Sequence, residues 1–188
     1  MTNAVTELQD AGHPVSVAIN AAPLPSLDEM TIRIKDTMGE AWIATQYREL
    51  IMPLRTRSFH LPVPARGQVR IEIQHTLLGL ELKIGKQRVF CPDLATARYL
   101  AVWARFGCTA VAVPYDITRI SRHADELESA WQRILLLISH LAAERTESFR
   151  SRLRAQITAH LRREIHDAGA GTPIPHFKQS TSQRTPVI

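Results

Sequence analysis

Three residues near the middle of the chain could together bind a metal ion: Glu72, Glu81 and Lys83. Two carboxylates can supply hard oxygen ligands to a divalent cation, and the lysine adds a positive charge beside them. Whether these side chains could share an ion depends on the elements that position them.

The segments that carry these residues show the two-residue period of half-buried strands. Apolar and polar side chains alternate over residues 69–74 and again over residues 80–84. Residues 76–79 predict a turn between them, and Gly85-Lys86 predicts a second turn into a strand over residues 88–91. The sequence therefore predicts a three-stranded antiparallel meander.

Strand register decides whether Glu72 and Glu81 could share an ion. In one register they face each other, and this like-charge contact is unfavourable unless a metal bridges it. In the other, Glu72 faces Lys83 and Gln74 faces Glu81, which gains roughly 0.2–1 kcal/mol from the opposite charges. The second register also places Gly79 at the last position of the turn, where glycine is favoured. Because it needs no ion, we predict that this sheet face is simply solvated.

Prolines, glycines and capping residues set the bounds of the other elements in the first two thirds of the chain. The alternation over residues 31–35 predicts a short strand, and a helix over residues 39–52 is ended by a proline. An aspartate cap and a closing glycine bound a helix over residues 93–106, and an apolar strand follows over residues 109–113.

This order of helix, strands, helix and strand resembles the core of the restriction-endonuclease-like nucleases. The strand that carries Glu81 and Lys83 also has the Glu-x-Lys triplet of that family. The resemblance implies a nuclease in which Glu72 is the first carboxylate, Glu81 and Lys83 form the triplet, and Glu40 or Glu49 is an acid on the preceding helix. In that family the two carboxylates hold a Mg²⁺ cofactor, and the lysine positions or polarises the attacking water molecule. Metal-dependent cleavage is therefore one functional hypothesis. Under the other hypotheses for this chain, no cofactor is predicted.

Residues 116–168 contain neither glycine nor proline, which predicts helix in one or two pieces. One continuous helix would be about 80 Å long at 1.5 Å per residue, so the segment must fold back or pair with a partner. The change in apolar spacing predicts a break near residues 144–148. We predict that the apolar residues of this segment mediate self-association or the binding of another protein: Leu127, Trp131, Ile134, Ile138, Leu141, Phe149, Leu153, Ile157, Leu161 and Ile165.

The positive charge of the chain is concentrated in its last quarter. The formal net charge is +5, and residues 144–188 carry eight basic and four acidic side chains. An arginine-rich helix flank could track the phosphates of a nucleic acid, or it could be a solvated flank of a coiled coil. No aromatic residue interleaves with these arginines, which argues against stacking of single-stranded bases on this helix. The candidate phosphate-binding residues are Arg150, Arg152, Arg154, Arg162 and Arg163.

Several other kinds of site and location are not predicted. Cys91 and Cys108 form no Cys-x-x-Cys pair, and the eight histidines never occur four residues apart, so no zinc site is expected. The sequence has no apolar run of membrane-spanning length, and its first residues lack a basic flank followed by an apolar run, so we expect neither a membrane span nor a secretory leader. We expect a cytoplasmic protein without membrane association.

These patterns predict an α+β protein in which a small, mostly antiparallel sheet, the meander plus one further strand, packs with two helices. The expected organisation is a flexible tail over residues 1–27, a core domain over 28–143, a basic helical arm over 144–168 and a disordered tail over 169–188. The favoured function is that of a non-catalytic interaction or scaffold protein that self-associates through the arm and has nucleic acid as a candidate ligand. A metal-dependent nuclease and a regulatory subunit of a larger complex are the alternatives.

Overall fold

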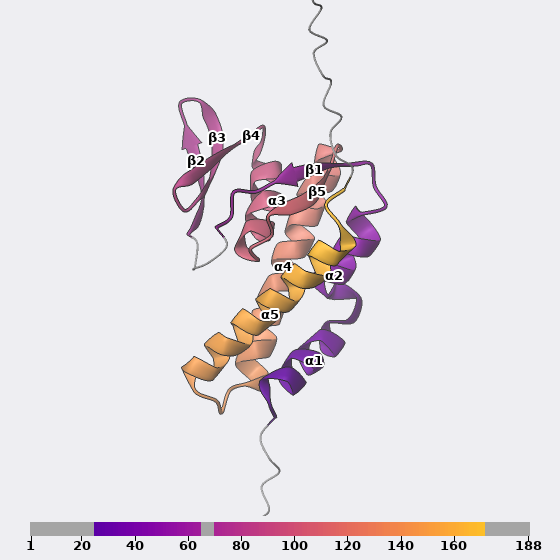
Figure 1. Cartoon of the computed structure of the whole chain (residues 1–188), viewed down its shortest axis with the longest axis vertical. Coiled ribbons are helices and arrows are strands. Elements are labelled where there is room, and N and C mark those ends of the chain that lie inside the picture. The colour runs from indigo at the N-terminus through magenta and orange to yellow at the C-terminus, as the bar shows by residue number, and fades with distance from the viewer. Residues whose placement is uncertain (1–24, 65–69, 172–188) are drawn as a thin grey trace, which may run out of the picture.

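The computed structural model describes residues 25–64 and 70–171, and most of the two predicted tails lies outside them (Figure 1). The fold is α+β, as predicted, with two small antiparallel sheets and a long pair of C-terminal helices. No helix in the described part of the chain is long and apolar enough to cross a membrane. The elements are α1 (Leu27–Met38), a 3₁₀ turn (Gly39–Ala41), α2 (Ile43–Gln46), a π-helical turn (Tyr47–Ile51), β1 (Thr56–His60), β2 (Ile71–Thr76), β3 (Gly79–Ile84), β4 (Gln87–Cys91), α3 (Leu94–Arg105), β5 (Ala110–Pro114), α4 (Ile117–Leu141) and α5 (Glu147–Ala168).

The predicted meander is confirmed in both topology and register. Strands β2, β3 and β4 pair antiparallel in chain order, with Glu72 opposite Lys83 and Gln74 opposite Glu81. Gly79 follows the two-residue turn with φ of +121°, and a Cβ atom there would lie 2.9 Å from Cε2 of Phe90. The positive φ therefore favours glycine at this position, and a larger residue would also displace the Phe90 ring. The register that needs no metal ion is the one adopted.

The further strand pairs differently from the expectation. Residues 110–114 form β5, but β5 pairs with β1 in a separate two-stranded sheet and does not join the meander. Strand β1 was not predicted, because its sequence, Thr-Arg-Ser-Phe-His, has no clear apolar alternation. This strand is defined by its distant partner, since β5 supplies its hydrogen bonds.

The strand predicted over residues 31–35 is wrong, because this segment lies within α1. Ser26 and Glu29 form a reciprocal capping box, with the Glu29 N–H donating to Ser26 Oγ and the Ser26 N–H donating to a Glu29 carboxylate oxygen. Met30, Ile34 and Met38 are buried at four-residue spacing. The capping box and the helical period prevail over a short local alternation.

The break predicted in the last helical segment is confirmed between α4 and α5. Thr146 caps α5 by accepting a hydrogen bond from the N–H of Phe149 at 3.2 Å. Figure 1 shows α5 running back along α4, and α5 also contacts α1, α2 and β5. The predicted arm is therefore packed against the body of the protein over its length.

A largely buried hydrogen-bond relay joins the π-helical turn, α3, β5 and the residue that follows α5. The Tyr47 hydroxyl donates to the carbonyl of Gly169 at 2.7 Å and accepts from the N–H of Ala112 at 2.8 Å. The Tyr99 hydroxyl donates to the carbonyl of Ala112 at 2.7 Å. Burial raises the pKa of Tyr47 to about 12, so its hydroxyl keeps its proton and remains a donor at neutral pH.

We expect Tyr47→Phe to lower the free energy of unfolding by about 1–3 kcal/mol, because it leaves the buried N–H of Ala112 and the partly buried carbonyl of Gly169 without their partner. Urea denaturation measures this change. Tyr115→Phe is the matched control, since Tyr115 is 56% exposed. Equal stability of the two variants would contradict the proposed importance of the relay.

Candidate nucleic-acid interface

The residues of the metal hypothesis lie together on the outer face of the meander and are all engaged in ion pairs. Lys83 Nζ is 3.6 Å from a Glu72 carboxylate oxygen, and Arg70 also contacts Glu72. Arg88 Nη1 is 3.2 Å from a Glu81 carboxylate oxygen. Each carboxylate is thus balanced by a cation of the protein. Within the described residues, no group of three His, Cys, Asp or Glu side chains is close enough to hold a metal ion.

The apolar residues predicted to mediate self-association lie within a single chain. Seven of the ten are buried in the core: Leu127, Ile134, Ile138, Leu153, Ile157, Leu161 and Ile165. The other three, Trp131, Leu141 and Phe149, are partly buried against that core. Their spacing reflects the packing of α4 and α5 within one molecule. Self-association through them stays a prediction that would require α5 to exchange between chains.

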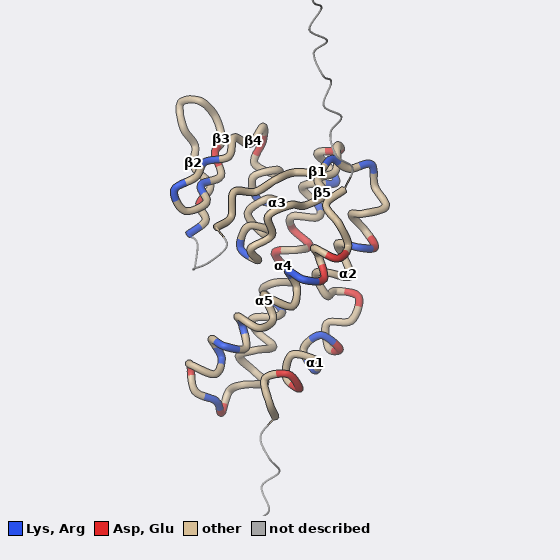
Figure 2. Tube along the Cα trace, viewed as in Figure 1, with Lys and Arg blue, Asp and Glu red and all other residues tan. Residues whose placement is uncertain are grey.

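Two of the predicted phosphate-binding residues meet two further arginines in one groove, which we call the arginine groove. Arg154 and Arg162 of α5 line it, together with Arg105 at the end of α3 and Arg70 before β2. The groove has a volume of about 810 Å³, and none of its lining residues is acidic. In Figure 2, basic segments recur along α5. Elements far apart in sequence therefore concentrate positive charge at one place.

Helical spacing and small side chains explain how α5 forms one wall of the groove. Its lining residues occur three or four positions apart, which places them on one stripe of the helix: Ser151, Arg154, Ala155, Thr158, Ala159 and Arg162. The serine and the two alanines leave space above the helix, while Arg162 lies at the C-terminal end of the stripe and Arg154 lies one turn from its other end. The apolar core stripe lies on a neighbouring side of the same helix.

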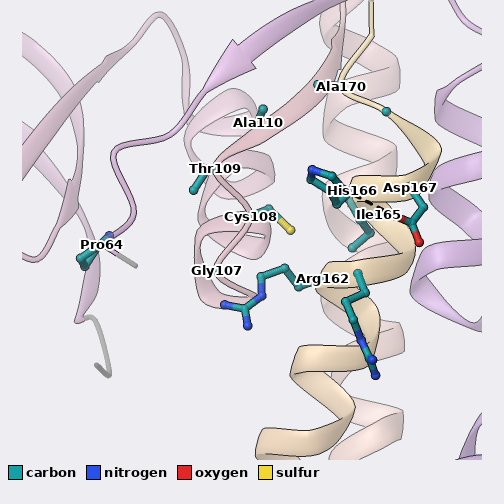
Figure 3. Close-up of a pocket in the computed structure, with 12 residues that line it drawn as sticks. Pro64, Gly107, Cys108, Thr109, Ala110, Arg162, Ile165, His166, Asp167 and Ala170 are labelled. Atoms are coloured by element: carbon teal, nitrogen blue, oxygen red, sulfur yellow. Dashed lines mark ion pairs between the residues drawn. The ribbon is translucent and has the colours of Figure 1, made fainter. Parts of the chain in front are cut away.

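Gly107 allows Arg162 to lie close to the end of α3. The φ of Gly107 is +78°, and a Cβ atom there would lie 3.1 Å from Nη1 of Arg162. Figure 3 shows the Arg162 side chain extending from α5 toward Gly107. The glycine predicted as a helix stop thus also leaves room for a guanidinium in the groove.

The four arginines differ in how far their charge is already balanced. Arg154 contacts Glu147, and Arg70 contacts Glu72. Arg105 and Arg162 are exposed and make no ion pair with any residue that the structure describes. Guanidinium groups without an internal partner can bind an external phosphate at no cost in broken ion pairs.

The other predicted arginines lie outside the groove. Arg150 Nε is 3.0 Å from a Glu147 carboxylate oxygen. Arg152 is exposed, and Arg163 is exposed beside a second pocket. The basic flank predicted from sequence is therefore divided between two sides of α5, and only two of its five arginines line the groove.

The second pocket continues from the arginine groove and contains a cysteine, a histidine and an aspartate. It has a volume of about 550 Å³ and shares Arg162 and Gly107 with the groove. Burial raises the pKa of Cys108 to about 12, so the thiol is protonated at neutral pH and is a poor nucleophile. His166 Nδ1 lies 3.5 Å from the carboxylate of its neighbour Asp167, and both side chains are exposed (Figure 3). We assign no covalent catalysis to this pocket.

A partly buried carboxylate holds α5 in the position that forms the groove. Glu164 accepts a hydrogen bond from Trp42 Nε1 at 2.7 Å, contacts Lys35 of α1, and lies 2.9 Å from Nε2 of His160. Burial by itself would raise the pKa of Glu164, but the hydrogen bonds from Lys35 and Trp42 outweigh it, and the pKa lies below its ordinary value of 4.5. The ionised carboxylate therefore stabilises the folded state.

The stability of the protein should depend on Glu164 in acid. A carboxyl whose pKa is lower in the folded state stabilises the fold above the unfolded pKa, and this contribution is lost as pH falls through the lower folded pKa. We expect wild-type protein to lose more unfolding free energy than Glu164→Gln between about pH 6 and about pH 3. Glu144→Gln, at an exposed position, should behave like wild type. Parallel pH profiles for wild type and Glu164→Gln would contradict the assignment.

Three contributors to this interface could not be predicted from the sequence: Arg70, Arg105 and Trp131. Each lies outside α5, and no spacing within the sequence links them to Arg154 or Arg162.

The chain matches no protein-family model, no curated protein and no solved structure.

Proposed function

We propose that the protein is a non-catalytic nucleic-acid-binding protein whose arginine groove holds the phosphate backbone. The observation that supports this proposal most is the convergence of Arg70, Arg105, Arg154 and Arg162 on one groove without an acidic lining residue. A guanidinium group offers a planar pair of donors that matches a phosphate, and its charge persists at every physiological pH.

The spacing of the arginines favours a chain of phosphates over a single small anion. Arg154 and Arg162 are eight residues apart on α5, which corresponds to about 12 Å along the helix axis. Arg105 and Arg70 extend the charge onto other elements across the groove. A ligand that contacts all four must carry several negative charges along its length. Nucleic acid meets this requirement and fits the predicted cytoplasmic location.

Fluorescence anisotropy of a labelled oligonucleotide across a series of salt concentrations tests this proposal. Each phosphate contact releases about 0.7 counterions from a single strand and about 0.9 from a duplex, so two to four contacts should give a slope of about −1.4 to −3.6 in a plot of log affinity against log salt. Absence of binding at about 50 mM salt, or affinity that does not change with salt, would contradict it.

Self-association and partner binding stay proposals alongside this function. The apolar residues predicted to mediate self-association are packed within one chain. A scaffold role would therefore require either exchange of α5 between chains or a different surface. Sedimentation of the protein with and without oligonucleotide tests how it assembles. A salt-independent oligomer in the absence of ligand would favour exchange, whereas assembly only with oligonucleotide would favour binding of several copies along one strand.

A further inference from the structure

Trp131 is the tryptophan that can reach a ligand in this protein. The three tryptophans of the chain all lie in the described residues, and Trp42 and Trp103 are each 0% exposed. Trp131, on α4, is partly exposed and lines the arginine groove. Its ring meets Phe106 edge to face, with centroids 5.1 Å apart and an interplanar angle of 71°. Phe106 thus holds the indole in place beside the arginines.

Trp131 also lines a further hollow, which we call the α4 hollow. It has a volume of about 640 Å³ and shares Arg105, Phe106 and Trp131 with the arginine groove. Arg133 lines the α4 hollow and makes no ion pair with a described residue. The one acidic residue among the described residues that line it, Glu128, is bound to Arg98 at 2.5 Å. The indole therefore lines two adjoining hollows, and arginines line both of them.

We infer that the ligand of the groove is single-stranded nucleic acid, with a base stacked on Trp131 and with flanking phosphates bound by Arg105, Arg162 and Arg133. This inference rests on the proposed function and specifies its ligand. Proteins that bind single strands combine a basic track along the backbone with an aromatic ring on which a base stacks. The helix α5 has no such ring of its own, and α4 supplies it from a distant part of the sequence.

Duplex DNA or RNA would not use Trp131 in this way. The bases of a duplex are stacked on one another, so an aromatic ring on the protein surface meets the backbone and gains no stacking partner. The arginines would still contact the phosphates of a duplex. Single-stranded ligand should therefore bind more tightly than duplex, and the difference should depend on Trp131.

Tryptophan fluorescence tests the inference on the full chain. The probes are an oligothymidylate of about twelve nucleotides and a matched duplex, since single-strand sites span about 4–16 nucleotides. We expect the single strand to quench the fluorescence saturably and to bind about tenfold or more tightly than the duplex. Trp131→Leu should lose the saturable quenching and weaken single-strand binding about tenfold, with duplex affinity unchanged.

Three results would overturn the inference, and they separate it from the proposed function. If both probes bind with salt-dependent affinity but equally tightly, or if single-strand binding leaves the tryptophan fluorescence unchanged, the inference fails and the proposed function stands. If neither probe binds, both fail. The quenching of wild-type protein needs no variant, so it remains decisive even if Trp131→Leu unfolds.

Discussion

Replacing Arg105 and Arg162 together by alanine should weaken oligonucleotide binding by about 100-fold. Hydrogen bonds to charged groups contribute about 1.5–3 kcal/mol each, and about 1.4 kcal/mol corresponds to a tenfold change in affinity. These two arginines come from different helices and have no ion-pair partner among the described residues, so their removal takes away contacts to the ligand without freeing an internal carboxylate.

Arg152→Ala is the matched control for this prediction. Arg152 lies on the same helix as Arg162, is also exposed, and does not line the groove. We expect its replacement to change affinity by at most about twofold, while each groove variant also reduces the salt slope by about one. If Arg152→Ala weakens binding as much as Arg162→Ala, the ligand recognises general surface charge and the groove has no special role.

Ile157→Ala should lower the free energy of unfolding by about 2–5 kcal/mol. Ile157 is 0% exposed at the centre of the buried stripe of α5, and truncation would leave a cavity between α5 and the body of the protein. Chemical denaturation followed by circular dichroism measures the loss. Leu136→Ala on α4 also truncates an aliphatic side chain, but Leu136 is 70% exposed. This change should lower the free energy of unfolding by less than about 0.5 kcal/mol.

This pair of variants also distinguishes the observed fold from an independent arm. If residues 144–168 packed only against a partner, Ile157→Ala would leave the unfolding of an isolated chain almost unchanged. A loss of stability that is independent of protein concentration would support packing of α5 on α4 within one chain. A loss that appears only at concentrations where the protein associates would instead support exchange of α5 between chains.

Local sequence patterns were sufficient to predict the elements whose hydrogen bonds and apolar contacts are made with residues nearby in the sequence. The meander and its register followed from alternation, from the charge pair Glu72 and Lys83, and from Gly79 in the turn. The N-terminal cap at Asp93 and the break between α4 and α5 were likewise predicted from the sequence. In each case the residues that determine the structure lie within a few positions of one another.

Prediction was wrong or incomplete where contacts between residues far apart in the sequence determine the structure. The alternation over residues 31–35 was short, and the capping box at Ser26 with burial of Ile34 made the segment helical. Strand β1 exists because β5 pairs with it. The ten apolar residues of α4 and α5 have the spacing of an interface, but spacing does not tell a partner within the chain from a partner outside it.

The candidate site could be predicted only in part from the sequence, for the same reason. Arginines on α5 could be recognised from their spacing, but spacing did not show that only Arg154 and Arg162 face the groove. Arg105 and Trp131 join them through the packing of α3 and α4 against α5. A binding surface formed by separate elements has no period along the sequence, so it becomes visible only in three dimensions.

Arginine labelling with phenylglyoxal, read by peptide mass spectrometry with and without bound oligothymidylate, tests the central claim most directly because it locates the bound ligand. We predict that the oligonucleotide protects Arg105 and Arg162 from labelling, and that Arg152 is labelled to the same extent in both samples. Equal labelling of Arg105 and Arg162 with and without saturating oligonucleotide, or protection of Arg152 in their place, would contradict the assignment of the arginine groove as the nucleic-acid interface.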